Sequence, residues 1–398
     1  MDARLVAAEH AARVIAPAYD ALDADGRRAH IAANPDSFLA ALPTGTEGGA
    51  DLATQRRALH RLHDSGRFRS LPGPAVLLLE LTEAATTVTA VVVDIEVEAF
   101  LDGRIRPHEH VRPDRVADLA SYLTEVRAAS SPVCVLHRRH HDLDEVVAKA
   151  RAGPPDLDTD LGAGDRVRVW TVADPTLRRR VARAAGQVQD ATVADGHHRA
   201  AAVARRVGPD AVHAAHRPGM AGPAPLEQHR LVLTALVAAD ELDIAPFHRR
   251  VDGLGPVTAA EVQAVLREVG LDARPLPGPS LPTGPGTLHL VVADRWFALD
   301  IHHLRGGAAR DQLDAAVAER SVLAPLATLA AGPEAAQLVP VPGPAGVGAL
   351  QRPGSVGVAL APPTLEQVLT ITGAGEVLPH KSTYLRPKLR SGILTVPR

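Results

Sequence analysis

The chain has 398 residues, more than one ordinary hydrophobic core accommodates, so two packed units are expected. Its 46% hydrophobic content and net charge of −3 are typical of a globular protein. They lack the basic excess of a protein that coats nucleic acid, so DNA is not an expected partner. No window approaches the roughly 20 apolar residues of a membrane span, and the N-terminus lacks a signal-peptide pattern. The single cysteine, Cys134, cannot form an internal disulfide, so we expect a cytoplasmic protein without a membrane partner.

The first half of the chain carries alternating helix and strand signals. Apolar periodicity predicts helices at residues 51–65 and 114–128 and from Pro175, a residue favoured in a first helical turn. Strands are predicted at residues 75–82, 86–95, 132–136, 166–172 and 191–193, the first two as a hairpin. Residues 101–113 and 153–165 are predicted loops. A further helix is predicted to begin at His197, directly after the strand at 191–193.

The second half begins with a predicted surface loop at residues 208–228 and a strong strand at 229–238. Helices are predicted at residues 257–269 and 309–323, and strands at 287–293 and 296–301. A proline-rich linker at 274–286 and a loop at 339–354 separate these elements, and a strand and helix follow at 356–371. Strands and helices mix without strict alternation, so the predicted fold class is α+β with mixed sheets.

The segment Asp195-Gly196-His197-His198-Arg199 is the first candidate site. A strand that turns into a helix here leaves backbone N–H groups at the helix start, where the helix dipole also favours an anion. Glycine allows close approach of a ligand, and arginine grips phosphate or carboxylate bidentately. The alternative is an aspartate cap followed by exposed histidines.

Two further segments carry candidate chemistry. In His108-Glu109-His110 an acid stands between two histidines and could act as a general base or hold a metal, although the segment taken alone favours a solvated loop. In Lys381-Ser382-Thr383-Tyr384, hydroxyl groups follow one of only three lysines in the chain. This segment could bind phosphate or pair with surface acids. The sequence does not identify metal ligands, because it contains no common zinc-binding or nucleotide-binding motif.

Five blocks occur together in a characteristic order. They are Ala16-Pro17-Ala18-Tyr19-Asp20; Pro107-His108-Glu109 with Asp114-Arg115 and Ser131-Pro132; Ala194 to Arg199; Pro246-Phe247-His248-Arg249; and Lys381 to Tyr384 with Pro387-Lys388. In this arrangement the chain resembles the bacterial domain-of-unknown-function 1015 family, often described as phosphoserine-phosphatase-cluster proteins. That family is thought to be related to the ParB/sulfiredoxin-like fold, some members of which phosphorylate free L-serine with ATP, ADP or pyrophosphate.

The resemblance implies a role for each block. Asp195 to Arg199 would bind the phosphate or nucleotide, and Lys381, Ser382, Thr383 and Tyr384 would close over it. Glu109, with His108, would be catalytic and accept the proton of a substrate hydroxyl. Tyr19, Asp20 and Arg115 would contact the small-molecule substrate. Mg²⁺ is the expected cofactor, because phosphoryl transfer usually needs a divalent metal.

The resemblance also implies a domain layout and leaves the function open. A ParB/sulfiredoxin-like phosphate-binding region would span residues 1–250, a small α/β subdomain or insertion 251–308, and a C-terminal region 309–398. Ala18, His110-Val111 and Ala200 depart from the residues usual in the family, which points to altered specificity or lost activity. A small-molecule kinase is the first hypothesis, a non-catalytic nucleotide-binding regulatory module the second, and a metal-dependent hydrolase using His108, His110, His197 and His198 the third. The oligomeric state is left open.

Overall fold

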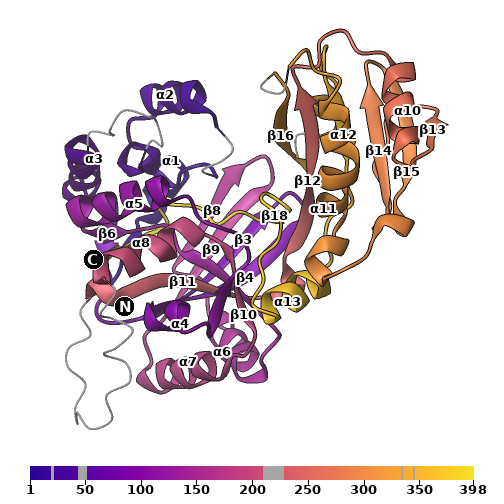
Figure 1. Cartoon of the computed structure of the whole chain (residues 1–398). Coiled ribbons are helices and arrows are strands. Elements are labelled where there is room, and N and C mark those ends of the chain that lie inside the picture. Colours follow the sequence, from indigo (N-terminus) through magenta and orange to yellow (C-terminus); the bar gives the residue numbers. More distant parts are fainter. Residues whose placement is uncertain (19–21, 44–51, 209–227, 333–334, 344–345) are drawn as a thin grey trace. The chain divides into compact units, whose positions relative to one another are not determined.

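The computed structural model describes residues 1–18, 22–43, 52–208, 228–332, 335–343 and 346–398. The chain divides into two compact units (Figure 1). Unit 1 contains Met1–Asp243 and Pro387–Arg398, and unit 2 contains Ile244–Arg386. Among the described helices, none is both long and apolar enough to cross a membrane. The fold class is α+β, as the sequence predicts, with several separate mixed sheets.

The largest sheet of unit 1 has eight strands in the order β5-β10-β7-β11-β4-β3-β9-β8. Their bounds are β3 Val76–Glu83, β4 Thr86–Glu96, β5 Ile105–Pro107, β7 Val133–His137, β8 Leu157–Gly162, β9 Asp165–Val172, β10 Ala191–Asp195 and β11 Leu231–Ala238. The central strand β11 is buried along its whole length, which explains its unbroken apolar sequence. It pairs in parallel with β7 and antiparallel with β4, so the sheet is mixed.

A smaller sheet of unit 1 joins the two ends of the chain. Its strands follow the order β2-β1-β19-β6, with bounds β1 Arg4–Val6, β2 Phe68–Ser70, β6 Ala128–Ala129 and β19 Leu394–Pro397. The N-terminal β1 pairs antiparallel with the C-terminal β19, with Leu5 opposite Leu394. The last residues are therefore part of the unit 1 fold although unit 2 precedes them in sequence.

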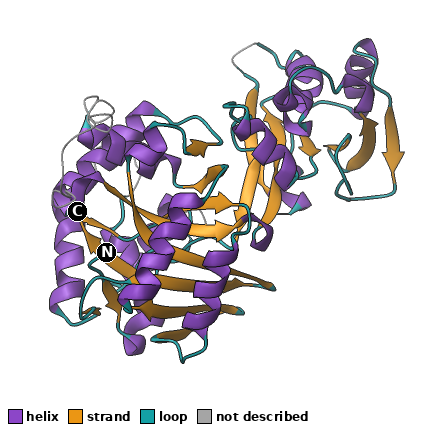
Figure 2. Ribbon diagram, turned by 90° about the horizontal axis from the view of Figure 1, so that it is seen from below, coloured by secondary structure: helices purple, strands orange, loops and turns teal. Residues whose placement is uncertain are grey.

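The helices of unit 1 pack in pairs on the large sheet (Figures 1 and 2). Their bounds are α1 Ala8–Val14, α2 Ala24–Ala33, α3 Leu52–Asp64, α4 Glu98–Leu101, α5 Pro113–Val126, α6 His141–Arg151, α7 Pro175–Gln187 and α8 His197–Val207. Helix α5 packs against α8, and α6 packs against α7. Helix α7 begins as its sequence predicts, because Asp174 accepts a hydrogen bond from the N–H of Leu177 and Pro175 occupies the first turn.

Unit 2 is built on a third sheet, in the order β13-β15-β14-β17-β12-β16, with β18 also pairing with β12. The strands are β12 Asp243–Asp252, β13 Ala273–Leu276, β14 Thr287–Val292, β15 Arg295–Asp300, β16 Gln337–Pro342, β17 Val356–Ala359 and β18 Thr383–Arg386. The helices are α10 Ala259–Glu268, α11 Asp314–Ala318, α12 Ala324–Ala327 and α13 Leu365–Gly373. Residues of α10, β14, β15, α11 and β17 share one hydrophobic core.

The four predicted loops and linkers that lie mainly within the described residues each miss a short strand. Residues 101–113 contain β5, 153–165 contain β8, 274–286 overlap β13, and 339–354 overlap β16. All four strands lie at the edges of their sheets. Edge strands are short and tolerate the proline, glycine and charged residues that suggest a loop in a sequence. The predicted loop at 208–228 falls almost entirely outside the described residues.

Candidate functional site

The turn between β10 and α8 is built around Gly196. Its φ of 93° lies in the left-handed region, which glycine adopts without the cost a Cβ would add. A Cβ at this position would also lie 2.6 Å from Nη2 of Arg199, whose guanidinium folds back over the glycine. No described side chain caps α8, so its first turn presents backbone N–H groups where an anion is favoured. The predicted alternative, an aspartate cap, is therefore wrong.

Asp195 faces two cations instead of capping the helix. Its carboxylate accepts a hydrogen bond of 2.6 Å from Arg199 and lies 3.7 Å from Nζ of Lys388. Burial is the largest single influence and raises the pKa of the Asp195 carboxyl, but the cations Lys388 and Arg199 together lower it well below its ordinary value. The carboxylate therefore stays ionised at neutral pH. Lys388 belongs to the same sequence block as Lys381 to Tyr384, and its pairing with Asp195 joins segments almost 200 residues apart.

The edge strand β5 brings His108 and Glu109 to the same place. It pairs in parallel with β10, with Ile105 opposite Ala191, so the residues that follow both strands emerge at one edge of the sheet. The backbone N–H of His108 donates a hydrogen bond of 3.2 Å to Nε2 of His197. The imidazole of His108 donates from Nδ1 to the carbonyl oxygen of Val193, at 2.5 Å. The structure thus joins two segments that the sequence predicts separately.

These contacts fix the protonation of His197. A backbone N–H only donates, so Nε2 of His197 is an acceptor and the ring proton is on Nδ1. That Nδ1 lies 3.4 Å from Oε1 of Glu109. Burial, with the neighbouring His108, lowers the pKa of His197 well below its usual value, so the ring is neutral. The rings of His108 and His197 meet edge to face, with centroids 4.4 Å apart.

The histidines therefore position the chain around the site. Nε2 of His198 accepts a hydrogen bond of 3.0 Å from the backbone N–H of Arg112, directly before α5. His197 and His198 together hold residues 108–112 against the start of α8. Arg199 differs from them, because its Nε has no hydrogen-bond partner among the described residues. An anion at the helix start would find this donor in addition to the backbone N–H groups.

Other predicted residues of unit 1 are not part of this cluster. His110 is exposed, and Arg115 is half-exposed on the first turn of α5, where its side chain makes no hydrogen bond or ion pair with any described residue. Tyr19 and Asp20 lie outside the described residues. His137 is buried in β7. The described residues contain no group of three or more His, Cys, Asp or Glu side chains arranged to hold a metal ion.

The predicted segment Lys381 to Tyr384 lies in unit 2, where a buried arginine organises it. Arg249 is 1% exposed and donates hydrogen bonds to the carbonyl oxygens of His380 and Lys381, at 2.9 and 3.0 Å. Its Nε also donates to Glu319. Lys381 adopts a left-handed φ of 54°, and its ammonium lies 5.4 Å from the ring centroid of Phe247. The block Pro246 to Arg249 and the C-terminal block therefore form one cluster.

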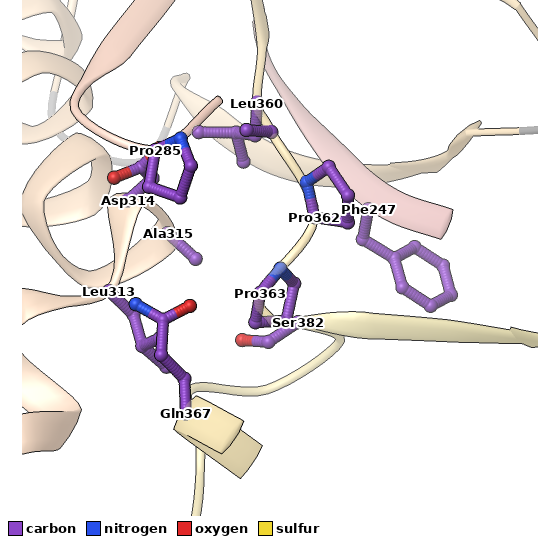
Figure 3. A pocket seen from close by; sticks show the side chains of 11 residues that line it. Phe247, Pro285, Leu313, Asp314, Ala315, Leu360, Pro362, Pro363, Gln367 and Ser382 are labelled. Carbon is purple, nitrogen blue, oxygen red and sulfur yellow. The ribbon is translucent and has the colours of Figure 1, made fainter. Parts of the chain in front are cut away.

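A small pocket adjoins this cluster (Figure 3). Ser382 and Gln367 lie along it with Pro363, and the hydroxyl of Ser382 donates to the carbonyl oxygen of Pro379. Its volume of about 10 Å³ accommodates about one water molecule. The pocket is therefore too small to bind a nucleotide or an amino acid in this conformation.

The fold and the Asp195–Arg199 turn define an α+β protein in which a helix start without a side-chain cap lies beside Glu109. The chain belongs to the family described as protein of unknown function (DUF1015), whose pattern matches residues 2–319. The segment Lys381 to Tyr384 lies beyond the matched residues. No curated protein matches the chain.

Solved structures resemble the chain at low similarity. A free serine kinase variant in complex with ADP is 14% identical with a TM-score of 0.38, covering 75% of this chain and 88% of its own. A conserved hypothetical protein from Pyrococcus furiosus is 14% identical with a TM-score of 0.36, covering 77% and 94%. SbnI with a C-terminal truncation, from Staphylococcus aureus, is 13% identical with a TM-score of 0.36, covering 74% and 82%.

Proposed function

We propose that unit 1 binds a phosphate-bearing ligand at the start of α8 and transfers a phosphoryl group from it to a small hydroxyl compound such as free L-serine. The observation that carries this proposal is the 3.4 Å contact between Nδ1 of His197 and Oε1 of Glu109. It places a carboxylate beside a helix start that has the geometry of an anion site. Positioned cations and a group that orients the nucleophile are the parts that phosphoryl transfer requires.

Each group has a defined part in this reaction. The backbone N–H groups after Gly196 and the guanidinium of Arg199 bind the phosphate oxygens. Glu109 accepts the proton of the substrate hydroxyl while the hydroxyl oxygen forms a bond to the terminal phosphorus of the donor. The bond from that phosphorus to the leaving phosphate breaks at the same time. ATP, ADP and pyrophosphate are the candidate donors, and the relationship to ParB/sulfiredoxin-like proteins remains a prediction.

Mg²⁺ is part of the proposal, as the usual partner of transferred phosphate groups. Mg²⁺ often takes only one or two protein carboxylates and fills its other positions with phosphates and water. Glu109 fits this role better than Asp195, whose carboxylate already faces both Arg199 and Lys388. A bound Mg²⁺ would neutralise the charge that develops on the transferred phosphoryl group.

The hydrolase alternative is weaker on geometric grounds. The Nε2 atoms of His197 and His198 accept backbone hydrogen bonds, and Nδ1 of His108 donates one. The Nε2 atoms of two of the four proposed imidazole ligands, His197 and His198, are therefore occupied, whereas the bond from Nδ1 of His108 is one that a metal-bound histidine can also make. His110, the fourth, is exposed.

The test incubates the purified protein with Mg²⁺, L-serine and each of ATP, ADP and pyrophosphate, and measures phosphoserine by mass spectrometry. Glu109→Gln is expected to lower kcat by about 10² to 10⁴, the usual contribution of a general base. Glu9→Gln, an exposed glutamate on α1, is the matched control and should be as active as the unmodified protein. Unchanged turnover in Glu109→Gln would contradict the assigned base. Nucleotide binding that requires Arg199 but yields no product from serine would favour the regulatory module.

A further inference from the structure

A second region of unit 1 has the character of a binding site. It is a groove of about 910 Å³ over the small sheet that joins the chain ends. Its lining comes from the second half of α3, the end of α5 and the strands β1, β6 and β19. Helix α5 separates it from the site at Glu109: Arg112 at one end contacts His198, and Arg127 at the other end lines the groove. Fourteen helical residues at 1.5 Å each place these ends about 21 Å apart.

The groove is strongly basic although the chain as a whole carries a net charge of −3. Its charged and imidazole lining residues are Arg4, Arg56, Arg57, His60, Arg61, His63, Asp64, Glu125 and Arg127. Arg56 and Glu125 form an ion pair of 2.7 Å across α3 and α5, so their charges offset each other. Four guanidinium groups then remain against the single carboxylate of Asp64. A fixed excess of positive charge in a concave surface attracts anions.

Three of these arginines are left without a counter-charge. Among the described residues, no carboxylate lies within ion-pair distance of Arg4, Arg61 or Arg127, and their side chains make no hydrogen bond. Arg57 and Arg61 also stand four residues apart on α3, a spacing at which like charges repel. His63 also lines the groove, and its pKa is lowered to about 4, mainly by burial and then by the positive charges of Arg4 and His60. An anion in the groove would relieve this repulsion.

Arg127 is also placed at a backbone cost. It ends α5 in the left-handed conformation, with φ of 54°, where glycine is the usual residue because a Cβ is unfavourable there. Its backbone N–H still caps the helix by donating to the carbonyl oxygen of Leu123. A glycine could make this same bond without strain. Unlike glycine, arginine at this position contributes a guanidinium group to the groove.

We propose that this groove binds a small molecule that carries a chain of phosphate groups. Guanidinium groups bind phosphate bidentately, and a phosphate chain presents charge to arginines from several elements at once. Apart from imidazoles, the lining residues in the described part of the chain include no aromatic ring on which a nucleic-acid base could stack. Asp64 and Glu125 in the lining favour a compact ligand over an acidic peptide that would run past both carboxylates.

The experiment titrates the full-length protein with tripolyphosphate and, separately, with orthophosphate by isothermal calorimetry at low salt. The unmodified protein is expected to bind tripolyphosphate at least tenfold more tightly, with an affinity that falls as salt rises. Arg61→Gln and Arg127→Gly should each weaken tripolyphosphate binding about tenfold or more. Arg127→Gly should also keep or raise the melting temperature, because glycine suits the left-handed backbone. Lost binding in this variant would then not reflect unfolding.

Two control variants distinguish binding in the groove from binding elsewhere on the protein. Arg179→Gln removes an exposed arginine from α7 and should leave tripolyphosphate binding unchanged. Arg199→Ala removes the candidate cation at the start of α8, and binding to the groove should survive it whether or not the proposed kinase function holds. Binding that is unaffected by Arg61→Gln and Arg127→Gly, or abolished by Arg199→Ala, would overturn the proposal. So would tighter binding through the groove of a uridine oligonucleotide or a glutamate peptide than of tripolyphosphate.

Discussion

Gly196→Ala tests the geometry of the candidate phosphate site most directly. Two costs can be assigned to the added methyl group. A non-glycine residue in the left-handed region costs about 1–2 kcal/mol. The Cβ would also lie 2.6 and 2.7 Å from Nη2 and Nε of Arg199, so the guanidinium must leave its place over the turn and its bond to Asp195. That ion pair is partly exposed and contributes about 0.2–1 kcal/mol.

We therefore expect Gly196→Ala to lower the free energy of unfolding by about 1–3 kcal/mol, measured by urea denaturation. Gly164→Ala is the matched control, because Gly164 has a φ of 85° but open space where its Cβ would lie. It should show the backbone cost alone and leave pyrophosphate binding unchanged. Gly196→Ala should weaken pyrophosphate binding about tenfold, which corresponds to 1.4 kcal/mol.

The double variant Gly196→Ala with Arg199→Ala isolates the collision. With the guanidinium gone, the alanine at position 196 should cost only what it costs at position 164, so the two substitutions should be non-additive. Equal stability losses in Gly196→Ala and Gly164→Ala, with pyrophosphate binding intact in both, would refute the role assigned to this turn.

Three further predictions follow from single side chains. The fold lowers the pKa of the Asp195 carboxyl from 3.8, so its charged form stabilises the protein above that pH and this contribution is lost as pH falls below it. The unfolding free energy of Asp195→Asn should therefore vary less between about pH 4 and 2 than that of the unmodified protein. Arg249→Met should cost about 3–5 kcal/mol in urea denaturation, because it leaves Glu319 and four carbonyl groups without the hydrogen bonds of Arg249, whereas a milder loss would show that the cluster relaxes. Lys388→Met should weaken pyrophosphate binding at the start of α8, measured by calorimetry, without changing tripolyphosphate binding to the basic groove.

The sequence predicts best what depends on neighbouring residues. The strand at 191–193, the turn at Gly196 and a helix beginning at His197 all follow from local rules of periodicity and of helix starts. The hairpin formed by β3 and β4 follows from the same rules. Elements that depend on distant partners are missed: β5 and β8 exist because β10 and β9 offer free edges, and their own residues suggest loops.

The same division applies to the site. Residue types identify Glu109 and Arg199 as candidates, but proximity of the segments that carry them depends on the parallel pairing of β5 with β10. The histidines show a second limit. Their composition suggests ligands for phosphate or metal, whereas the structure uses Nε2 of His197 and His198 to accept backbone hydrogen bonds. Tertiary contacts determine which nitrogen of an imidazole forms a hydrogen bond and with which partner, and a local sequence pattern does not contain these contacts.

The pairing of Asp195 with two cations would let this turn release Arg199 to the anion that we propose it binds. A phosphate at the start of α8 competes with Asp195 for the guanidinium of Arg199. If Arg199 were the sole counter-charge, moving it to the ligand would leave a carboxylate unpaired, and that cost would oppose binding. Lys388, 3.7 Å from the other carboxylate oxygen, remains on Asp195 when Arg199 turns to the phosphate. In the proposed function, the C-terminal segment would therefore contribute to binding without touching the ligand, because Lys388 would compensate the charge that Arg199 leaves behind.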